Sequence, residues 1–509
     1  MRSRDPAYLA LALLTLSCGG GGGKNDGGPT GTPGGDGPAT GSVLERNNGP
    51  NRNGVFVQPE LTKARAAKMV LDRTFDGTVS GNVYASPLYV EGTPGVFVIA
   101  TENNQISVLD ENTGLPVWQH TYGTPAGATG AGCGNISPLG ITGTPVIDPA
   151  KRTIYFDAAT GTSTAITDHL IHAVSLDDGS ERSGWPVSAK SVSDGGEQFN
   201  PALHNQRSAL ALVSGILYVS FSGHFGDCGN YRGWLFGIDT AAPTSIKTFK
   251  TGATRGGGIW GAGGPSSDGT NIFVTTGNTF GATTWSRGEA VIRVQSGPVF
   301  SGQPSDFFAP TNWQSLDSAD LDLSGSAPLV VDAPAFTPPE LVLAFGKDGN
   351  VYALDRNNLG GIGAQKAMLH VMNGQIVNAS AAVTTPAGTL VAMHGSRNAT
   401  AQGCPTGSGD LATVKLSGTS IAMAWCANNG GQGSPIVTTT DDHGSEAIVW
   451  TAGAGGTNKL HAWDAATGAV VFDGGADGFS AVRSFTSPIA VRARIVVAGD
   501  NKVFAFRPQ

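Results

Sequence analysis

The stretch "ISVLDENTGLPVW", residues 106–118, decides the fold because other parts of the chain repeat its spacing. An apolar run leads to Asp110, then to Gly114 and then to Trp118. An Asp that caps backbone N–H groups and a Gly at positive φ are typical of a tight hairpin. We therefore interpret Asp110 as a hairpin cap, expect its neighbour Glu111 to be solvated, and expect Trp118 to pack between neighbouring sheets. The spacing recurs at Asp464, Gly468 and Phe472 in "WDAATGAVVF", with looser copies at residues 177–185 and 355–360.

The hairpin belongs to a longer repeat, in which a small residue, a Pro or Ala and a β run recur eight times. Each copy continues into a second and a third apolar strand, and seven of the eight continue into a fourth. The chain ends at "KVFAFRPQ", three strands into the last copy, whereas a strand candidate without a partner, "KMVLDRTF" from Lys68, precedes the first copy. The copies start at residues 85, 143, 208, 264, 326, 380, 433 and 486.

These repeats predict an all-β fold, an eight-bladed β-propeller of four-stranded antiparallel blades that is closed by the N-terminal strand. Such a ring protects strand edges because one terminus completes the blade of the other. Abundant glycine, 75 residues, and a charged fraction of only 14% agree with short strands between turns. A seven-bladed propeller and two smaller propellers are the alternatives.

The blade pattern resembles the tryptophan-docking repeat of quinoprotein-type propellers. That family includes the pyrroloquinoline quinone (PQQ) dependent alcohol dehydrogenases and a lipoprotein that assists outer-membrane β-barrel assembly. The segments "GITGTPVID", "HNQR", "GIW" followed by "TGN", and "FGKDGNVYALDRNNLGG" resemble a subgroup of quinoprotein-like bacterial envelope lipoproteins. The resemblance implies a PQQ-like propeller domain and does not fix an activity.

Residues 1–18 resemble a bacterial lipoprotein signal peptide. A basic start, "MRSR", precedes the apolar "AYLALALLTL", which is too short to span a bilayer, and "LSC" follows. The resemblance implies cleavage before Cys18 and acylation of its thiol, although Thr15 stands where leucine is usual. Gly19 resembles the choice for outer-membrane sorting, so we expect an outer-membrane lipoprotein in the cell envelope of a Gram-negative bacterium. An ordinary secretory peptide is the alternative.

Residues 19–55 are rich in Gly and Pro and start with "GGGGGKNDGGPTGTPGG". Because this composition offers little apolar surface to bury, it predicts a disordered tether in front of a propeller domain at residues 56–509. The net charge of −8 and the lack of a Lys/Arg cluster argue against nucleic acid as a partner. We expect a monomer that contacts the membrane through its lipid.

Four cysteines follow Cys18, and all lie in loops that the propeller places on one face. Export through an oxidising compartment favours disulfide bonds, and four cysteines allow three pairings. We favour Cys133 with Cys228 and Cys404 with Cys426. A metal site is the alternative, but the Cys and His spacing does not support one.

The long insertions lie in loops between blades and in loops between second and third strands, which emerge on one face if the first strand is innermost. Arginine and lysine there could hold carboxylates or quinone oxygens, and tryptophan could stack on a flat ring. The alternative is that these side chains bond blade to blade. The candidates for ligand binding are His204, Asn205, Gln206, Arg207, His224, Arg255, Trp260, Asn278, Trp285, Arg287, Lys347, His394 and Arg397.

Known catalytic motifs do not identify an active site. The sequence has no G-x-S-x-G, H-E-x-x-H or P-loop lysine, and "GGGIWG" at residues 256–261 lacks the βαβ context of a dinucleotide site. In "DSADLDLSG", Asp317, Asp320 and Asp322 could offer oxygens to Ca²⁺, but the stretch resembles the turn before an inner quinoprotein strand. We therefore assign no metal site and no catalytic residue.

Two function classes remain. In the first, the chain is a binding or scaffold module whose loop-rich face takes a protein, peptide, glycan or small molecule. In the second, it is a PQQ-dependent dehydrogenase that uses Ca²⁺ to oxidise an alcohol or a sugar. PQQ alcohol dehydrogenases carry adjacent cysteines that this sequence lacks, but soluble PQQ sugar dehydrogenases lack them too. Because the Ca²⁺ ligands cannot be matched to any motif, we favour the binding module.

Overall fold

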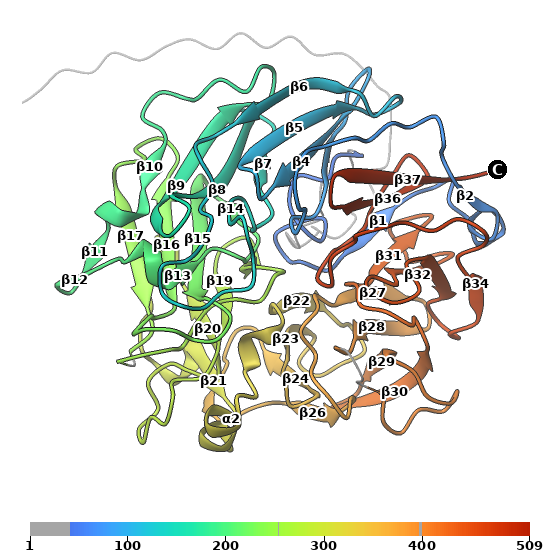
Figure 1. Cartoon of the computed structure of the whole chain (residues 1–509). Helices are drawn as coiled ribbons and strands as arrows, with labels where there is room; N and C mark the ends of the chain where they lie inside the picture. Colours follow the sequence, from blue (N-terminus) through green and yellow to red (C-terminus); the bar gives the residue numbers. More distant parts are fainter. Residues whose placement is uncertain (1–40, 253, 397–399) are drawn as a thin grey trace, which may run out of the picture. The chain divides into compact units, whose positions relative to one another are not determined.

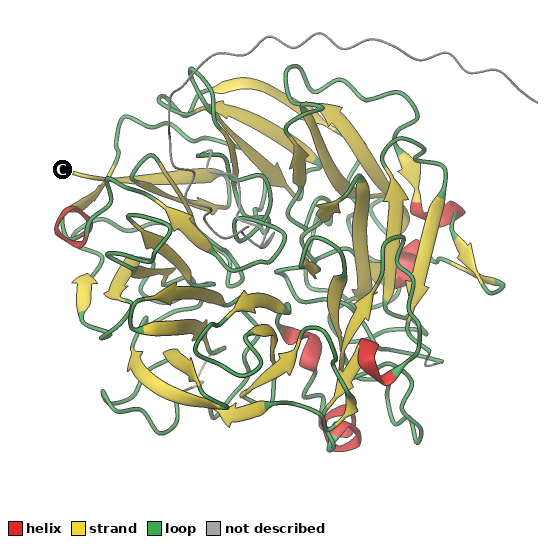
Figure 2. Cartoon of the chain, turned by 180° about the vertical axis from the view of Figure 1, so that it is seen from behind, coloured by secondary structure: helices red, strands yellow, loops and turns green. Residues whose placement is uncertain are grey.

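A computed structural model describes residues 41–252, 254–396 and 400–509 of the chain. This part is built almost wholly of strands, which form eight four-stranded antiparallel blades (Figures 1 and 2). The β-propeller, its eight blades and its four strands per blade are therefore confirmed. Cys18, residues 19–40 of the predicted tether and Arg397 lie outside the described residues.

The first strand of each blade is the innermost, and all eight inner strands lie where the repeat predicts them. The first four blades are, from the inside outward, β3 (Leu88–Val90), β4 (Val96–Thr101), β5 (Gln105–Asp110) and β6 (Pro116–Thr121); β7 (Val146–Asp148), β8 (Thr153–Gly161), β9 (Ile166–Ser175) and β10 (Val187–Ser188); β14 (Ala211–Val213), β15 (Ile216–Gly223), β16 (Trp234–Asp239) and β17 (Ile246–Lys250); and β18 (Ser266–Ser267), β19 (Ile272–Thr276), β20 (Ala290–Val294) and β21 (Phe307–Ala309).

The other four blades complete the ring. They are β22 (Leu329–Asp332), β23 (Glu340–Phe345), β24 (Asn350–Asp355) and β26 (Ala367–His370); β27 (Ala381–Thr385), β28 (Gly388–His394), β29 (Leu411–Ser417) and β30 (Ser420–Ala427); β31 (Ile436–Thr439), β32 (Ile448–Ala452), β33 (Leu460–Asp464) and β34 (Val470–Phe472); and β35 (Ile489–Val491), β36 (Arg494–Gly499), β37 (Lys502–Pro508) and β2 (Met69–Leu71).

The ring closes as predicted, because the N-terminal strand β2 supplies the outer strand of the eighth blade. It pairs antiparallel with β37, with Met69 opposite Pro508 and Leu71 opposite Phe506 (Figure 1). This pairing covers the outer edge of the last C-terminal strand, which would otherwise expose unpaired backbone groups.

Short elements join or flank the blades. They are β1 (Val55–Val57), α1 (Lys63–Ala66), η1 (Ala189–Ser191), β11 (Ser193–Asp194), β12 (Glu197–Gln198), η2 (Pro201–Leu203), β13 (His204–Asn205), η3 (Pro304–Asp306), α2 (Trp313–Ala319), η4 (Leu323–Gly325) and β25 (Gly361–Ile362). None of the helices in the described ranges has the length and apolar character needed to cross a membrane.

The hairpin after β5 has the predicted geometry. The Asp110 carboxylate accepts hydrogen bonds from the backbone N–H groups of Asn112 at 3.0 Å and Thr113 at 2.9 Å, and Gly114 has φ +69°. The Trp118 indole donates to the Leu176 carbonyl in the second blade at 2.9 Å. The interpretation of Asp110 as a cap and of Trp118 as a contact between blades is therefore confirmed.

The expectation that Glu111 is solvated is wrong. Its side chain is only 5% exposed, and it accepts hydrogen bonds from the Tyr89 hydroxyl and, at 2.8 Å, from Arg492. Arg492 follows β35 of the eighth blade, so Glu111 joins the first blade to the last. The local hairpin sequence contains no sign of this distant partner.

Residues 43–58, which we call the plug, contact the inner strands of all eight blades. Plug carbonyls accept N–H groups from the second, fourth, fifth, sixth and seventh blades, Val43 pairs with Tyr89 in the first, Arg52 donates to Leu210 in the third, and Gln58 bonds to Ala490 in the eighth. At its end, β1 runs parallel to β31 (Figure 1).

The plug corrects the end of the predicted tether, which was placed at residue 55. Arg46, Asn47 and Arg52 are each at most 2% exposed, so this part of the chain belongs to the folded propeller. The prediction was wrong here because the plug is stabilised by polar contacts with inner strands rather than by apolar side chains of its own.

Candidate functional site

Three of the candidate residues meet at the loop-rich end of the propeller, which we call the mouth. Arg207 precedes β14, Trp260 precedes β18, and Lys347 lies between β23 and β24. The Arg207 guanidinium carbon lies 5.4 Å from the centre of the Trp260 ring, and the Lys347 ammonium lies 5.3 Å from it. We call these three residues the mouth cluster.

The guanidinium of Arg207 also lies over a second ring, that of Phe485, whose centre is 4.2 Å away. No carboxylate or other hydrogen-bond acceptor among the described residues contacts this guanidinium. Burial lowers the pKa of Arg207 to about 10, which still leaves the side chain charged at neutral pH. The mouth therefore holds a cation between two aromatic rings without a counter-charge.

A second arginine, Arg46 of the plug, also contacts Phe485. It donates to the Phe485 carbonyl and, at 3.4 Å, to Ser434. Burial, together with the charges of Arg52 and Arg207, lowers the pKa of Arg46 to about 9. Its Nε–H has no acceptor in the part of the chain that the structure describes.

Lys347 differs from both arginines because it is paired. Its ammonium lies 2.5 Å from the Asp322 carboxylate and 3.1 Å from that of Asp320. Burial opposes the charge, but these two carboxylates raise the pKa of Lys347. Asn278, another candidate, joins this group by donating its backbone N–H to Asp322 at 2.8 Å and its amide to Asp320 at 3.3 Å.

One buried carboxyl group accompanies these ion pairs. Glu289 is fully buried, accepts the Leu323 backbone N–H at 2.8 Å, and leaves its other oxygen without a partner among the described residues. Burial and the nearby charge of Asp322 raise the pKa of Glu289 well above its usual value. The environment of Glu289 therefore favours its neutral form.

The carboxylates of this region do not fit a calcium ion. Asp322 is held by Lys347 and by the Asn278 N–H, and Asp317 accepts the backbone N–H groups of Thr279 and Gly281. Within the described ranges, no group of three His, Cys, Asp or Glu side chains is placed to hold a metal ion. A dication would have to displace the Lys347 ammonium from both of its partners.

Four other candidates lie inside or beside the third blade. His204 and His224 are each 3% exposed, and burial lowers their pKa values to about 4 and about 3. The His204 ring stacks on Phe199 with centres 4.4 Å apart. Gln206 donates to the Ser208 carbonyl at 2.5 Å, and Asn205 pairs with Ser222 in the strand register.

Three further candidates pack against phenylalanine rings. The Arg255 guanidinium lies 4.2 Å from the centre of the Phe280 ring, and Trp285 stacks on Phe307 at 4.0 Å. Arg287 donates to the Lys250 carbonyl at 3.0 Å. Arg255 and Arg287 contact residues of both the third and the fourth blade, whereas Trp285 and Phe307 lie in the fourth blade.

The last described candidate, His394, lies under a polar cavity. It is 1% exposed, and its Nε2 lies 3.6 Å from the Asp410 carboxylate. The cavity has a volume of about 400 Å³ and opens between the loops of the last three blades. It is lined almost entirely by small or polar residues: Ser396, Thr400, Ser408, Gly409, Asp410, Asn428, Gly430, Gly431, Gln432, Ala454, Gly455, Gly456 and Ser484.

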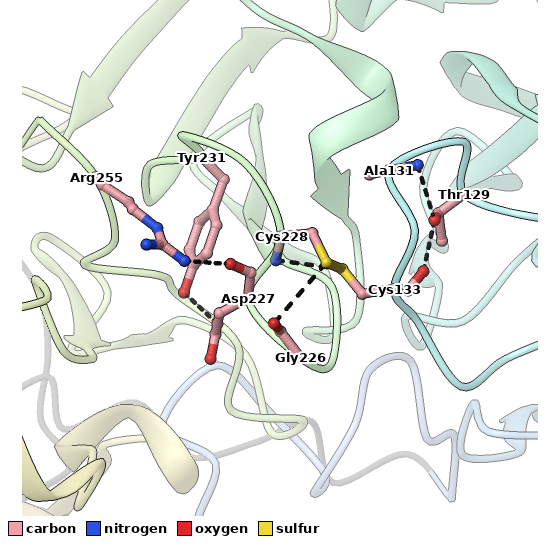
Figure 3. The surroundings of a disulfide bond; sticks show 8 residues. All are labelled: Thr129, Ala131, Cys133, Gly226, Asp227, Cys228, Tyr231 and Arg255. Carbon is pink, nitrogen blue, oxygen red and sulfur yellow. Dashed lines mark hydrogen bonds between the residues drawn. A yellow bond between two sulfur atoms is a disulfide. The ribbon is translucent and has the colours of Figure 1, made fainter.

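Both predicted disulfides, Cys133 with Cys228 and Cys404 with Cys426, are present, with Cα atoms 5.9 Å apart in each. The first fixes the loop before the second blade to a loop of the third (Figure 3). Beside it, the Tyr231 hydroxyl donates to the Asp227 carboxylate at 2.6 Å, and Arg255 donates to the Asp227 carbonyl (Figure 3). The cross-link thus holds the rim of the mouth in one arrangement.

Sequence reasoning missed Arg46, Phe485 and Glu289. Arg46 was assigned to the tether, although "VLERNNG" interrupts the Gly- and Pro-rich composition just after residue 42. That change in composition was the available signal. Phe485 and Glu289 lie in loops without a motif, so only the fold brings them to the mouth.

The sequence matches no known protein family and no curated protein. Among solved structures, the fold is similar to quinohemoprotein alcohol dehydrogenase from Comamonas testosteroni, with TM-score 0.61, 13% identity, and 92% of this chain and 81% of that chain covered. It is also similar to quinohemoprotein alcohol dehydrogenase ADHIIG from Pseudomonas putida HK5, with TM-score 0.63, 11% identity and coverage of 92% and 80%. It is also similar to a europium-containing methanol dehydrogenase, with TM-score 0.59, 14% identity, and 91% of this chain and 89% of that chain covered. These likenesses establish the quinoprotein-like propeller fold.

Proposed function

We propose that this chain is a binding module of the cell envelope, anchored by a lipid on Cys18, whose mouth takes a small-molecule ligand at Arg207, Trp260 and Lys347. The observation that carries this proposal is the Arg207 guanidinium, which lies between two aromatic rings and has no counter-charge among the described residues. The Arg207 side chain is half-buried, so water can solvate its charge in the free protein, and a ligand with a counter-charge can replace that water.

The position of residues 41 and 42 agrees with such an anchor. Gly41 donates to the Glu91 carboxylate at 3.0 Å, and the Ser42 hydroxyl accepts the Glu91 N–H at 2.9 Å. Glu91 follows the inner strand β3, which starts at the mouth, so the chain enters the propeller at the opposite face.

Calorimetric titration with a panel of charged and neutral ring compounds tests the proposal. We expect at least one compound to bind the wild type and to bind Trp260→Ala at least tenfold more weakly. Trp285→Ala is the matched control, because Trp285 stacks on Phe307 and contacts no member of the mouth cluster. If every compound that binds does so equally well to Trp260→Ala, the mouth cluster is not the binding site.

A PQQ-dependent dehydrogenase is the second candidate function, and the residues of the mouth fit its cofactor only in part. PQQ is a flat anion that accepts hydride from a substrate, and Trp260 and Arg207 are suited to its ring and carboxylates. The calcium ion that accompanies it does not fit, because Lys347 occupies Asp320 and Asp322. We therefore derive no catalytic step.

Adding PQQ, with and without Ca²⁺, to the full-length protein separates the two functions. The binding module predicts no dye reduction with any member of an alcohol and aldose panel. Turnover that requires both PQQ and Ca²⁺ would establish the dehydrogenase. It would also contradict the inference that Lys347 keeps Asp320 and Asp322 from binding calcium. Tight PQQ binding without turnover would identify PQQ as a ligand of the mouth.

A further inference from the structure

We propose that the polar cavity between the loops of the last three blades is a second binding site, separate from the mouth cluster, and that its ligand is a neutral carbohydrate. The cavity has a volume of about 400 Å³, within the range of about 300 to 1,000 Å³ that is typical of small-molecule sites. Arg207, Trp260 and Lys347 are absent from its described lining. The two sites therefore share no residue, and each can be tested without the other.

The walls of the cavity come mainly from segments that flank the second, third and outermost strands of two blades. Residues 408–410 lead into β29, the third strand of the sixth blade, and Asn428 follows β30, its outermost strand. Residues 454–456 join the second strand of the seventh blade, β32, to the third, β33. Gln432 and Ser484 lie in the connections to the next inner strands. The cavity is therefore a feature of the junction between neighbouring blades.

One carboxylate in the cavity is held in a fixed position. Asp410 accepts the backbone N–H groups of Asn429 at 2.6 Å and of Gly430 at 3.0 Å. Its Oδ2 also lies 3.6 Å from Nε2 of His394. Burial opposes the charge, but His394 and the Asn429 N–H lower the pKa of Asp410 below its usual value. The side chain is 19% exposed, so the ionised carboxylate is open to accept hydrogen bonds from a ligand.

Other polar side chains of the cavity are not used by the fold. The side chains of Ser408, Gln432 and Ser484 form no hydrogen bond to a described residue. Gln432 and Ser484 are half-buried, and Ser408 is exposed at the rim. Hydroxyl and amide groups can both donate and accept hydrogen bonds, as the hydroxyls of a sugar do. These side chains are therefore available to a ligand that carries many hydroxyl groups.

The chemistry of the lining favours a neutral carbohydrate over an apolar or a cationic ligand. Among the described residues of the lining, none is aromatic or a large aliphatic residue, and Asp410 alone carries a charge. An apolar ligand would bury little apolar surface against such walls. A cation would meet a single carboxylate that already accepts two N–H groups. A sugar hydroxyl, in contrast, can donate to Asp410 while another accepts from the amide of Gln432.

Glycine keeps the cavity open. Gly455 at the rim has φ +66°, and a Cβ built there would have no atom within 4 Å. The neighbouring backbone is closely packed, because a Cβ on Gly456 would clash with the Gly430 carbonyl oxygen and a Cβ on Gly431 with the Gly453 backbone. The space beside Gly455 is therefore free for a ligand, whereas the segments around it are fixed by packing.

The loop that carries Ser408 is fixed before any ligand binds. The Cys404–Cys426 disulfide joins this loop to β30. The Thr406 hydroxyl donates to the Cys426 carbonyl and accepts the Cys426 N–H, both at 2.9 Å. A site that is already held in one arrangement loses little conformational entropy when it binds a ligand.

Saturation-transfer NMR of the full-length protein, in a detergent without a sugar headgroup, tests the ligand class. The probes are glucose, galactose, mannose and N-acetylglucosamine, with propylammonium as a cation that has no hydroxyl groups. We expect at least one sugar to bind and propylammonium to bind at least tenfold more weakly than that sugar.

The variant Gly455→Asn assigns the binding to the cavity. It places a side chain in the open space, at a backbone conformation that asparagine tolerates, and should weaken sugar binding at least tenfold. Gly215→Asn is the matched control, because Gly215 has φ +79° and open space at its Cβ position but lies in the hairpin between β14 and β15.

The variant Asp410→Asn tests the carboxylate and should also weaken sugar binding at least tenfold. Because Asp410 accepts two backbone N–H groups, this variant can lose stability. Gln432→Ala removes no hydrogen bond of its side chain to a described residue and should weaken sugar binding severalfold. Gly455→Asn and Gln432→Ala decide the matter if Asp410→Asn fails to fold.

The outcomes distinguish the cavity from the mouth. Sugar binding that is lost in Gly455→Asn but kept in Gly215→Asn and Trp260→Ala supports the cavity site, whatever the mouth binds. Sugar binding that is lost in Trp260→Ala but kept in Gly455→Asn would place the sugar at the mouth and overturn the inference. If propylammonium binds more tightly than every sugar and depends on Asp410, the ligand class is wrong. If no sugar binds in a way that depends on Gly455, the inference falls, while the proposed function of the mouth is decided by its own titration.

Discussion

Two arginines of the plug differ in how they are satisfied. Arg52 donates to the carbonyls of Pro265 at 2.9 Å and of Arg46 and Leu210 at 2.8 Å, and it pairs with Glu45. Arg46, like Arg207 of the mouth, has no carboxylate partner in the described ranges; Arg46 bonds to the Phe485 carbonyl, and Arg207 lies against two aromatic rings. The protein therefore supplies the counter-charge of Arg52, whereas no described carboxylate pairs with Arg46 or Arg207.

This difference distinguishes a structural arginine from a candidate binding residue. The polar groups of Arg52 have partners in the protein, because an unsatisfied buried charge destabilises the fold. Arg207 is half-buried, so its donors are open to water or to a ligand and need no partner in the protein. The pairing of each cation is therefore the useful guide to function in this propeller.

The largest effect is expected from removing the plug. A chain that starts at residue 59 should lose cooperative folding, because the inner strands of all eight blades lose contacts with residues 43–58. A chain that starts at residue 41 keeps these contacts and should unfold at the wild-type temperature. Thermal unfolding followed by circular dichroism checks both, and equal midpoints for the two chains would show that the plug is dispensable.

The next largest effect is expected from Arg52→Gln. Breaking a buried ion pair on one side leaves Glu45 without its partner, which costs about 3–5 kcal/mol. Arg207→Gln should change the free energy of unfolding by less than about 1 kcal/mol, because it removes no hydrogen bond to a described residue. Denaturant unfolding of the two variants measures this contrast. Similar losses of unfolding free energy would remove the distinction between Arg52 and Arg207.

A smaller, pH-dependent effect is expected from Glu102. This carboxyl is fully buried, and burial raises its pKa to about 7, although the Gly140 N–H donates to it at 2.6 Å. Because the folded pKa exceeds that of the unfolded chain, the unfolded state binds fewer protons between these two values, and stability falls as pH rises through that window.

The variant Glu102→Gln should remove this pH dependence. At pH 8 it should be more stable than the wild type by up to about 3 kcal/mol, and at pH 4 the difference should vanish. Thermal midpoints measured across this range check the sign. A variant that is less stable than the wild type at pH 8 would show that the ionised carboxylate stabilises the fold.

The smallest effect is expected from Asp110→Ala, which removes the hairpin cap and should cost about 1 kcal/mol. Its counterpart Asp464→Ala also loses the ion pair with Lys63, which spans 2.7 Å, and should cost slightly more. Binding at the mouth should be unchanged in both variants. A loss of binding at the mouth in Asp110→Ala would show that the hairpin caps do more than stabilise the fold.

The blades could be predicted because their signals are local. The spacing from Asp110 to Trp118 contains the cap, the turn and the aromatic contact, and the same chemistry recurs in each copy. The closing strand and both disulfides followed from the repeat and from the number of cysteines.

The mouth could be predicted only in outline. Arg207, Trp260 and Lys347 were among the candidates because long loops must emerge at that face. Arg46 was missed, because its contacts depend on residues 43–58 meeting the inner strands of eight separate blades, and only the change in composition after residue 42 marks this segment in the sequence. Glu111 was misread for the same physical reason, since its partner Arg492 lies at the other end of the chain.

The most direct test of the central claim is the thermal unfolding of Arg207→Gln and Arg52→Gln, each with and without a saturating ring compound that binds the mouth of the wild type. The account predicts that Arg207→Gln keeps the wild-type midpoint without the compound but gains nothing from it. Arg52→Gln should unfold at a lower temperature and still be stabilised by the compound. An Arg207→Gln variant that unfolds as early as Arg52→Gln, yet is stabilised by the compound as much as the wild type, would contradict the account.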